Sequence, residues 1–500
     1  MQDGGRTKTR VGRLARSIAE TAAEDTALWV SFCVFWLWPW LLSNSAARFQ
    51  ESLAGQGVPL FFVLFDRLSL FAFLGSTLLA FAVAYRLHGK RIPRGFSPYV
   101  VSTSLALASF LALAVFQIGF DDPVVLIGLV AARSLFGGIG IALLCLECGM
   151  SFGMIGAHKT LLCGAIATVA SAAAAFVLAS APVLVSQIAL VLLAVVCAFS
   201  LRAVSRKRAA LEGGAMSESS SVVSADSVRI PWKLTITTIV WTGSFGAVSA
   251  VFEFGSYWSD YGLASYACAA FGLLACMAYL KVNFNDLIYK AGFLVAAAGL
   301  ALMLYSGTLS PEGYMLFVAG YRFIELLVWG LYAHLIRTRS LSPLWTVSLN
   351  VGVWTLGRFF GYLAGYAVLG RPVAAFGEEA FALVLSVELL LLVSALFLSN
   401  RNNFVEGWGM ERVIDRHRSE RQIAYCCDRI ASQCDLTLKE REILAYLAKG
   451  MSRTEISDEL VVSPETTKTH VRHIYRKLGV GSREEILDMI DEEIALSNDC

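Results

Sequence analysis

Two groups of residues in this 500-residue chain have types and spacings that could do chemistry. The first is a basic run near the C-terminus, residues 464–478, where four cations stand against the single acid Glu465. The cations are Lys468, Arg472, Arg476 and Lys477. The surrounding segment 435–496 holds 9 Lys/Arg and 13 Asp/Glu, so its net charge is negative. One basic helix in an acidic domain indicates insertion into a nucleic-acid groove, and the alternative is a solvated basic face.

The second group consists of ionisable residues inside long apolar segments, where a charge is costly and usually faces a cavity or a partner. These residues are Asp66, Arg67, Arg133, Glu147, Glu253, Arg322, Glu325, Arg358 and Glu388. Arg133 and Arg322 lie at similar depth in corresponding segments, and two converging guanidinium groups would bind a small anion. Arg358 and Glu325 complete this candidate ligand site. The alternative is that Arg322 only pairs with Glu325, one helical turn away.

The composition divides the chain into an apolar region and a charged region. The chain is 56% hydrophobic and 16% charged, with a mean hydropathy of +0.62. Residues 401–500 alone carry 15 Lys/Arg and 19 Asp/Glu. This distribution predicts a membrane body followed by a water-soluble tail, and it excludes a purely soluble enzyme, a disordered chain and a disulfide-stapled secreted scaffold.

Twelve segments are long and apolar enough to span a bilayer, which takes about 20 residues each. The expected spans are 27–44, 59–85, 97–119, 122–146, 160–181, 183–202, 234–258, 261–280, 287–306, 313–336, 344–369 and 376–399. Twenty Lys/Arg fall on the side of the N-terminus and only Arg48 and Arg371 on the other side. The positive-inside rule therefore places both termini in the cytoplasm.

The longest loop, Arg202 to Lys233, divides the spans into six plus six. This arrangement resembles the major facilitator architecture, whose halves pack around a central cavity. The acidic-Arg signature of that family is missing from Tyr85–Arg94, a departure that bears on transport. We therefore expect an all-α fold, a twelve-span bundle plus a small cytoplasmic domain. The predicted divisions are a basic N-terminus 1–26, a first half 27–202, a central loop 203–233, a second half 234–399, a connector 400–434 and a C-terminal domain 435–496.

The C-terminal segment contains the start and stop signals of four short helices. Three capping boxes are expected at Thr437–Glu440, Ser452–Glu455 and Ser482–Glu485, since a hydroxyl and a Glu three residues apart can satisfy each other's backbone N–H. Ser463 followed by Pro464 begins a further helix. The pair of helices about residues 453–460 and 464–478, joined by a tight turn, predicts a helix-turn-helix.

The residues Leu436–Leu444, Gly450–Ser457 and Ser463–Val480 closely resemble the LuxR-type helix-turn-helix domain over about 60 residues. The resemblance implies a recognition helix in the major groove of double-stranded promoter DNA and dimerisation through the last helix, about 483–494. By motif position Lys468, Thr469 and Arg472 would face base edges. The residues expected at phosphates or the groove wall are Thr466, Thr467, His470, Arg476 and Lys477. The family usually has Val where this chain has Thr467.

The whole chain resembles the membrane-integral LuxR-type regulators of actinobacteria. That resemblance implies that the body senses an unknown small molecule and that the tail acts on transcription. We expect a multi-pass protein of the bacterial inner membrane. Because the sequence offers no Ser/His/Asp pattern, no phosphate-binding glycine loop and no histidine cluster, we expect no enzyme, cofactor or metal. Two alternatives remain open, a transporter with a regulatory DNA-binding tail and a passive membrane anchor for a constitutive regulator. Cys426, Cys427 and Cys434 with His417 match no standard zinc spacing.

Overall fold

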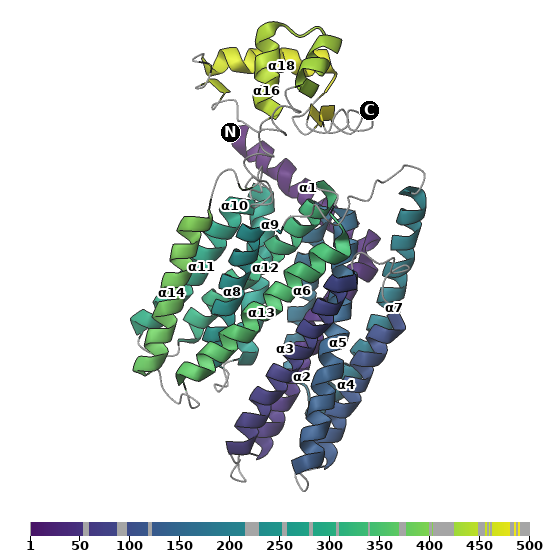
Figure 1. Cartoon of the computed structure of the whole chain (residues 1–500), viewed down its shortest axis with the longest axis vertical. Coiled ribbons are helices and arrows are strands. Elements are labelled where there is room, and N and C mark those ends of the chain that lie inside the picture. The colour runs from purple at the N-terminus through teal and green to yellow at the C-terminus, as the bar shows by residue number, and fades with distance from the viewer. Residues whose placement is uncertain are drawn as a thin grey trace. The chain divides into compact units, whose positions relative to one another are not determined.

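The structure is a computed structural model of the whole chain (Figure 1). It describes residues 2–53, 60–87, 98–118, 123–215, 230–252, 258–279, 284–306, 310–338, 341–369, 377–399, 403, 425–448, 456–457, 460, 463–480, 485–486 and 489–490. The chain forms two compact units. One contains residues 1–228 and 233–401, and the other contains residues 229–232 and 402–500.

The first unit is a helical body. Its helices are α1 Gln2–Glu24, α2 Thr26–Leu53, α3 Leu60–Leu87, α4 Pro98–Ile118, α5 Pro123–Ile155, α6 Ala157–Ala179, α7 Val183–Ala215, α8 Trp232–Phe252, α9 Trp258–Tyr279, α10 Phe284–Asp286, the π-helix η3 Leu287–Gly292, α11 Phe293–Ser306, α12 Pro311–Thr338, α13 Pro343–Leu369 and α14 Glu378–Leu398. Each of the twelve expected spans falls on one helix, except the ninth, which covers η3 and α11 in succession. The elements that the structure describes are helices, as the sequence predicts.

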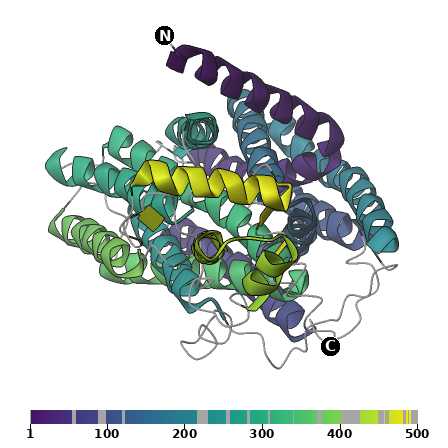
Figure 2. The same cartoon turned by 90° about the horizontal axis from the view of Figure 1, so that it is seen from above.

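The apolar lengths of these helices agree with a membrane body. Among the described residues, eight helices are long and apolar enough to cross a membrane, and a ninth counts if the bent pair α1–α2 forms one span. Shorter apolar stretches lie in α4, Pro98–Ala114, and in α9, Leu263–Tyr279. Helix α1 meets α2 at a bend of 86°, and Figure 2 shows it, in dark purple, running across one end of the body.

The helices from the two parts of the body pack against one another. Within the first part α5 packs on α3 and α4, and α2 packs on α7; within the second, α12 packs on α9 and α11. Contacts between the parts join α13 to α3, α6 to α9 and α12 to both α5 and α6. Buried aromatic rings line this junction, where Phe32 of α2 lies 5.5 Å from Trp329 of α12.

Helices α8 and α13 approach each other at glycine. A Cβ on Gly361 would lie 2.1 Å from the carbonyl oxygen of Gly243, and one on Gly246 would lie 2.6 Å from the carbonyl oxygen of Arg358. Such short distances admit only hydrogen at these positions, which allows backbones to come close. The close crossing brings Arg358 of α13 against the aromatic side chains of α8.

The second unit is a small helical domain with its own core. Helices α16 Leu438–Ala448 and α18 Pro464–Leu478 pack together, and residues 425–433 form a further helix. Cys426, Cys427 and Ile430 of that helix are fully buried beside Ile443 and Ile474. Cys426, Cys427 and Ile430 lie within the partly helical connector predicted over 400–434. Its last ten residues belong to the domain core, because their apolar positions recur at helical spacing and bury one face.

Candidate functional site

The basic helix α18 is held in place by caps at both ends. The Ser463 hydroxyl accepts a hydrogen bond from the Thr466 N–H at 3.1 Å, and Pro464 occupies the first turn. At the other end Gly479 has φ +70° and its N–H bonds the Tyr475 carbonyl. Both signals are local, so the predicted start at Ser463–Pro464 is confirmed. The boxes predicted at Ser452–Glu455 and Ser482–Glu485 fall largely outside the described residues.

Five of the predicted DNA-contacting side chains project from the exposed face of α18. Lys468, Thr469, Arg472 and Arg476 are exposed, as is Thr466. Lys468 forms an exposed ion pair with Glu465 at 2.8 Å, and such a pair is weak enough to be exchanged for a phosphate or a base edge. His470 is half-buried on the flank of the same face.

Thr467 does not lie on this face, which corrects the prediction that it contacts DNA. Its side chain is fully buried and shares the core-facing side of α18 with Val471, Ile474 and Leu478. The Thr467 hydroxyl makes no hydrogen bond among the described residues. The family usually has Val at this position, and an apolar residue there indicates a buried side chain.

Replacing Thr467 with valine is expected to stabilise the C-terminal domain by roughly 1 kcal/mol, since it removes a buried hydroxyl without a partner and conserves volume. Hydrogen exchange of α18 in the full-length protein measures this change. Thr469→Val is the matched control, because Thr469 is exposed and its hydroxyl bonds the Glu465 carbonyl at 2.9 Å. Faster exchange in Thr467→Val than in the parent would contradict the burial argument.

The ammonium group of Lys477 bonds to two partners within the domain. It donates to Glu440 Oε2 at 2.7 Å and to the Asp435 carbonyl at 2.9 Å. Glu440 is almost fully buried at the start of α16 and closes the predicted capping box. The Thr437 N–H donates to Glu440 Oε2 at 2.9 Å, and the Glu440 N–H donates to the Thr437 hydroxyl at 3.3 Å. Lys477 therefore ties α18 to α16, and its contact with DNA stays a prediction.

The electrostatics of Glu440 follow from these partners. Burial by itself would raise its pKa, but Lys477 and the Thr437 N–H and hydroxyl outweigh burial and lower the pKa from 4.5 to about 2. His473 lies beside the same carboxylate, with Nδ1 3.8 Å from Oε1. This carboxylate is thus charged at neutral pH and joins α16 to α18.

In the helical body, Arg322 lies at the junction between the two parts. Its guanidinium lies over the rings of Trp36 of α2 and Tyr266 of α9, at 4.2 and 4.1 Å from the ring centroids. It donates to Glu325 Oε2 at 2.6 Å and to the Tyr266 hydroxyl. The predicted pairing of Arg322 with Glu325 is present, and aromatic faces on both sides hold the cation in place.

The structure groups Arg322 with Arg358 and not with Arg133. Arg358 lies 5.0 Å from the centroid of Phe245, whose ring stacks at 4.0 Å on Tyr321, and Arg322 lies 5.5 Å from the centroid of Tyr321. Arg133 of α5 instead donates to the Ser69 hydroxyl of α3 at 2.5 Å. The cluster that could hold a ligand therefore contains Arg322, Glu325 and Arg358.

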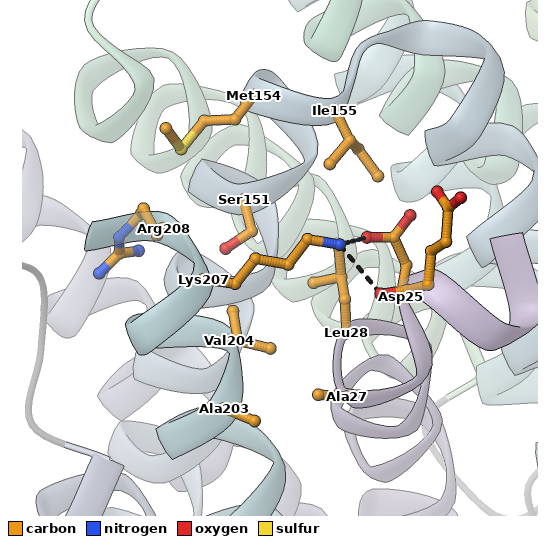
Figure 3. Close-up of a pocket in the computed structure, with 11 residues that line it drawn as sticks. Asp25, Ala27, Leu28, Ser151, Met154, Ile155, Ala203, Val204, Lys207 and Arg208 are labelled. Carbon is orange, nitrogen blue, oxygen red and sulfur yellow. Dashed lines mark hydrogen bonds and ion pairs between the residues drawn. The ribbon is translucent and has the colours of Figure 1, made fainter. Parts of the chain in front are cut away.

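Two ion pairs of the body, one buried and one with a half-exposed lysine, were not predicted from the sequence. Arg208 of α7 pairs with Glu147 of α5 at 2.7 Å, and Lys207 pairs with Asp25, at the α1–α2 corner, at 2.5 Å. Figure 3 shows Lys207 reaching this corner across a cavity of about 40 Å³. That volume accommodates water-sized molecules, so this cavity does not suit an organic ligand. Apolar segments give no signal of which helices supply the partners.

The cysteines named above do not form a metal site in the part of the chain that the structure describes. Cys426 and Cys427 are buried in the domain core, and Cys434 is half-buried at the end of the same helix. No group of three His, Cys, Asp or Glu among the described residues could hold a metal ion. His417 lies outside the described residues.

The fold and the outward-facing basic helix define the second unit as a DNA-binding helix-turn-helix domain. Residues 435–490 match the family described as bacterial regulatory proteins, luxR family. The domain is 42% identical over 53 residues to an HTH-type transcriptional regulator of Mycobacterium bovis, covering 11% of this chain and 6% of that protein. It is 50% identical over 48 residues to the regulatory protein NarL of Mycobacterium tuberculosis, covering 10% of this chain and 22% of NarL. The chain thus spans a small part of these relatives.

The helical body is similar in structure to transporters of the major facilitator type. The crystal structure of the human organic anion transporter MFSD10 matches with a TM-score of 0.48 and 14% identity, covering 77% of this chain and 99% of that one. The major facilitator superfamily proton:xylose symporter XylE matches with a TM-score of 0.49 and 13% identity, covering 77% of this chain and 95% of that one.

Proposed function

We propose that this chain is a transcriptional regulator embedded in the bacterial inner membrane, with both termini in the cytoplasm. Its helical body senses a small anionic molecule, and its C-terminal domain binds promoter DNA as a dimer. The luxR-family match and the exposed cations of α18 support DNA binding. The excess of Lys/Arg on the side of the N-terminus supports the orientation.

The observation that carries the sensing role is the position of Arg322 between the two parts of the body. Its guanidinium contacts Trp36 from the first six spans and Tyr266 and Glu325 from the last six. A molecule that binds beside this group contacts both parts at once, so its affinity depends on their arrangement. Such differential affinity is the physical requirement for a ligand to shift a conformational equilibrium.

A body exchange tests the sensing role. The body, residues 1–401, is replaced by an unrelated multi-span anchor, and genome-wide binding of the C-terminal domain is compared with the parent chain in the same host. We expect the exchange to abolish growth-condition-dependent changes in DNA occupancy. Unchanged regulation would support a passive anchor, and gradient-driven accumulation of a solute in vesicles containing the parent chain would support the transporter alternative.

Replacing Arg472 with alanine is expected to weaken DNA binding by about 1–3 kcal/mol and to relax the preference at one base pair, because an exposed guanidinium at this motif position reads a base edge. Footprinting or selection from a random DNA pool with full-length protein measures both effects. Arg441→Ala is the control, since Arg441 lies on α16 and bonds the Ser432 hydroxyl. Identical footprints for Arg472→Ala and the parent would refute the groove assignment.

A further inference from the structure

The charge of the junction cluster is not balanced. Arg322 and Glu325 neutralise each other through their 2.6 Å ion pair. Arg358 lies over the rings of Phe245 and Trp354, at 5.0 and 4.8 Å, and no carboxylate among the described residues lies within ion-pair distance of it. Aromatic faces partly compensate a cation, but they provide less than a carboxylate does. The cluster therefore has a net charge of one positive unit.

The same cluster has an excess of hydrogen-bond donors. Trp241 lies 4.5 Å from Tyr321, whose ring stacks on Phe245, and the Trp241 indole N–H makes no hydrogen bond. The Trp354 indole N–H, the Tyr321 hydroxyl and the Nε–H of Arg358 are likewise unsatisfied in the described structure. Trp241 and Tyr321 are each only 2% exposed, and leaving such groups unpaired costs free energy. These unsatisfied donors could be satisfied by a bound molecule that carries hydrogen-bond acceptors.

We propose that this cluster binds a small organic monoanion, and that Arg358 supplies its counter-charge while the Trp241 and Trp354 indoles and the Tyr321 hydroxyl donate to its oxygen atoms. This inference rests on the proposed sensing function and specifies the class of ligand. A carboxylate fits the planar fork of a guanidinium. A dianion would leave one negative charge uncompensated in a buried site. Arg133 belongs to the α3–α5 contact and not to this site.

The first test needs no ligand. The melting temperature of the full-length protein in detergent is measured for Arg358→Met and Arg322→Met. We expect Arg358→Met to raise the melting temperature, because it removes a cation that lacks a carboxylate. Arg322→Met is expected to lower it, because the buried Glu325 then loses its ion-pair partner. Equal destabilisation by both variants would overturn the proposal, since Arg358 would then be satisfied inside the protein.

The second test uses defined probes. Sodium acetate, butyrate and benzoate are the monoanions, succinate is the dianion and benzamide is the neutral probe. We expect at least one monocarboxylate to raise the melting temperature of the parent and of Arg133→Met, but not of Arg358→Met. No shift with any monocarboxylate, an equal shift in Arg358→Met, or a larger shift with succinate or benzamide would each overturn the proposal. The body exchange tests sensing separately, so the two can fail independently.

Discussion

Replacing Arg208 with methionine is expected to destabilise the helical body by roughly 3–5 kcal/mol, the largest effect among the variants considered. Arg208 Nη1 lies 2.7 Å from Glu147 Oε2, and the two side chains are 5% and 1% exposed. Removing the guanidinium takes away the ion-pair partner that lies 2.7 Å from the buried Glu147 carboxylate. The cost of keeping that carboxylate buried after its ion pair is lost determines the size of the effect.

The double variant Arg208→Met/Glu147→Gln separates these two contributions. We expect it to recover much of the stability lost in Arg208→Met, because no buried charge is then left alone. Melting of the full-length protein in detergent measures all three variants. Lys159→Met is the control, since Lys159 pairs with Glu24 at 2.9 Å but both side chains are well exposed, and little change is expected there. Equal effects of Arg208→Met and Lys159→Met would refute the buried pair.

Replacing Glu440 with glutamine is expected to destabilise the C-terminal domain by up to about 3 kcal/mol at neutral pH. The carboxylate pairs with Lys477 at 2.7 Å and accepts the Thr437 N–H at 2.9 Å, so its pKa is about 2 in the folded chain and near 4.5 when unfolded. Because folding lowers the pKa, this stabilisation is fully present above pH 4.5. It is lost as the pH falls from 4.5 towards 2.

Hydrogen exchange of α16 and α18 in the full-length protein measures this effect, with labelling times scaled to the intrinsic exchange rate at each pH. In the parent, protection should fall between pH 4.5 and 2, and in Glu440→Gln that part of the pH dependence should be absent. Glu465→Gln is the matched control, because its ion pair with Lys468 is exposed and should add no comparable pH dependence. The same pH profile for Glu440→Gln and the parent would contradict the assignment.

The sequence by itself determined features that depend on neighbours a few residues apart. Helix α18 begins at Ser463 because a hydroxyl, a proline and the N–H of Thr466 lie within three residues. The Thr437–Glu440 box forms for the same reason. Long apolar segments likewise predict the helices of the body, since a run of about 20 apolar residues marks a span wherever it lies in the chain.

Only the tertiary structure decided which faces of these helices meet. Lys477 is 37 residues from Glu440, and Lys207 is 182 residues from Asp25, so no local pattern indicates either pair. Arg133 and Arg358 look alike in sequence as single arginines in apolar helices. Packing places Arg133 against a serine hydroxyl and Arg358 among aromatic rings. A periodic pattern gives the spacing of side chains along one helix, whereas the partner of a buried charge depends on how separate helices pack.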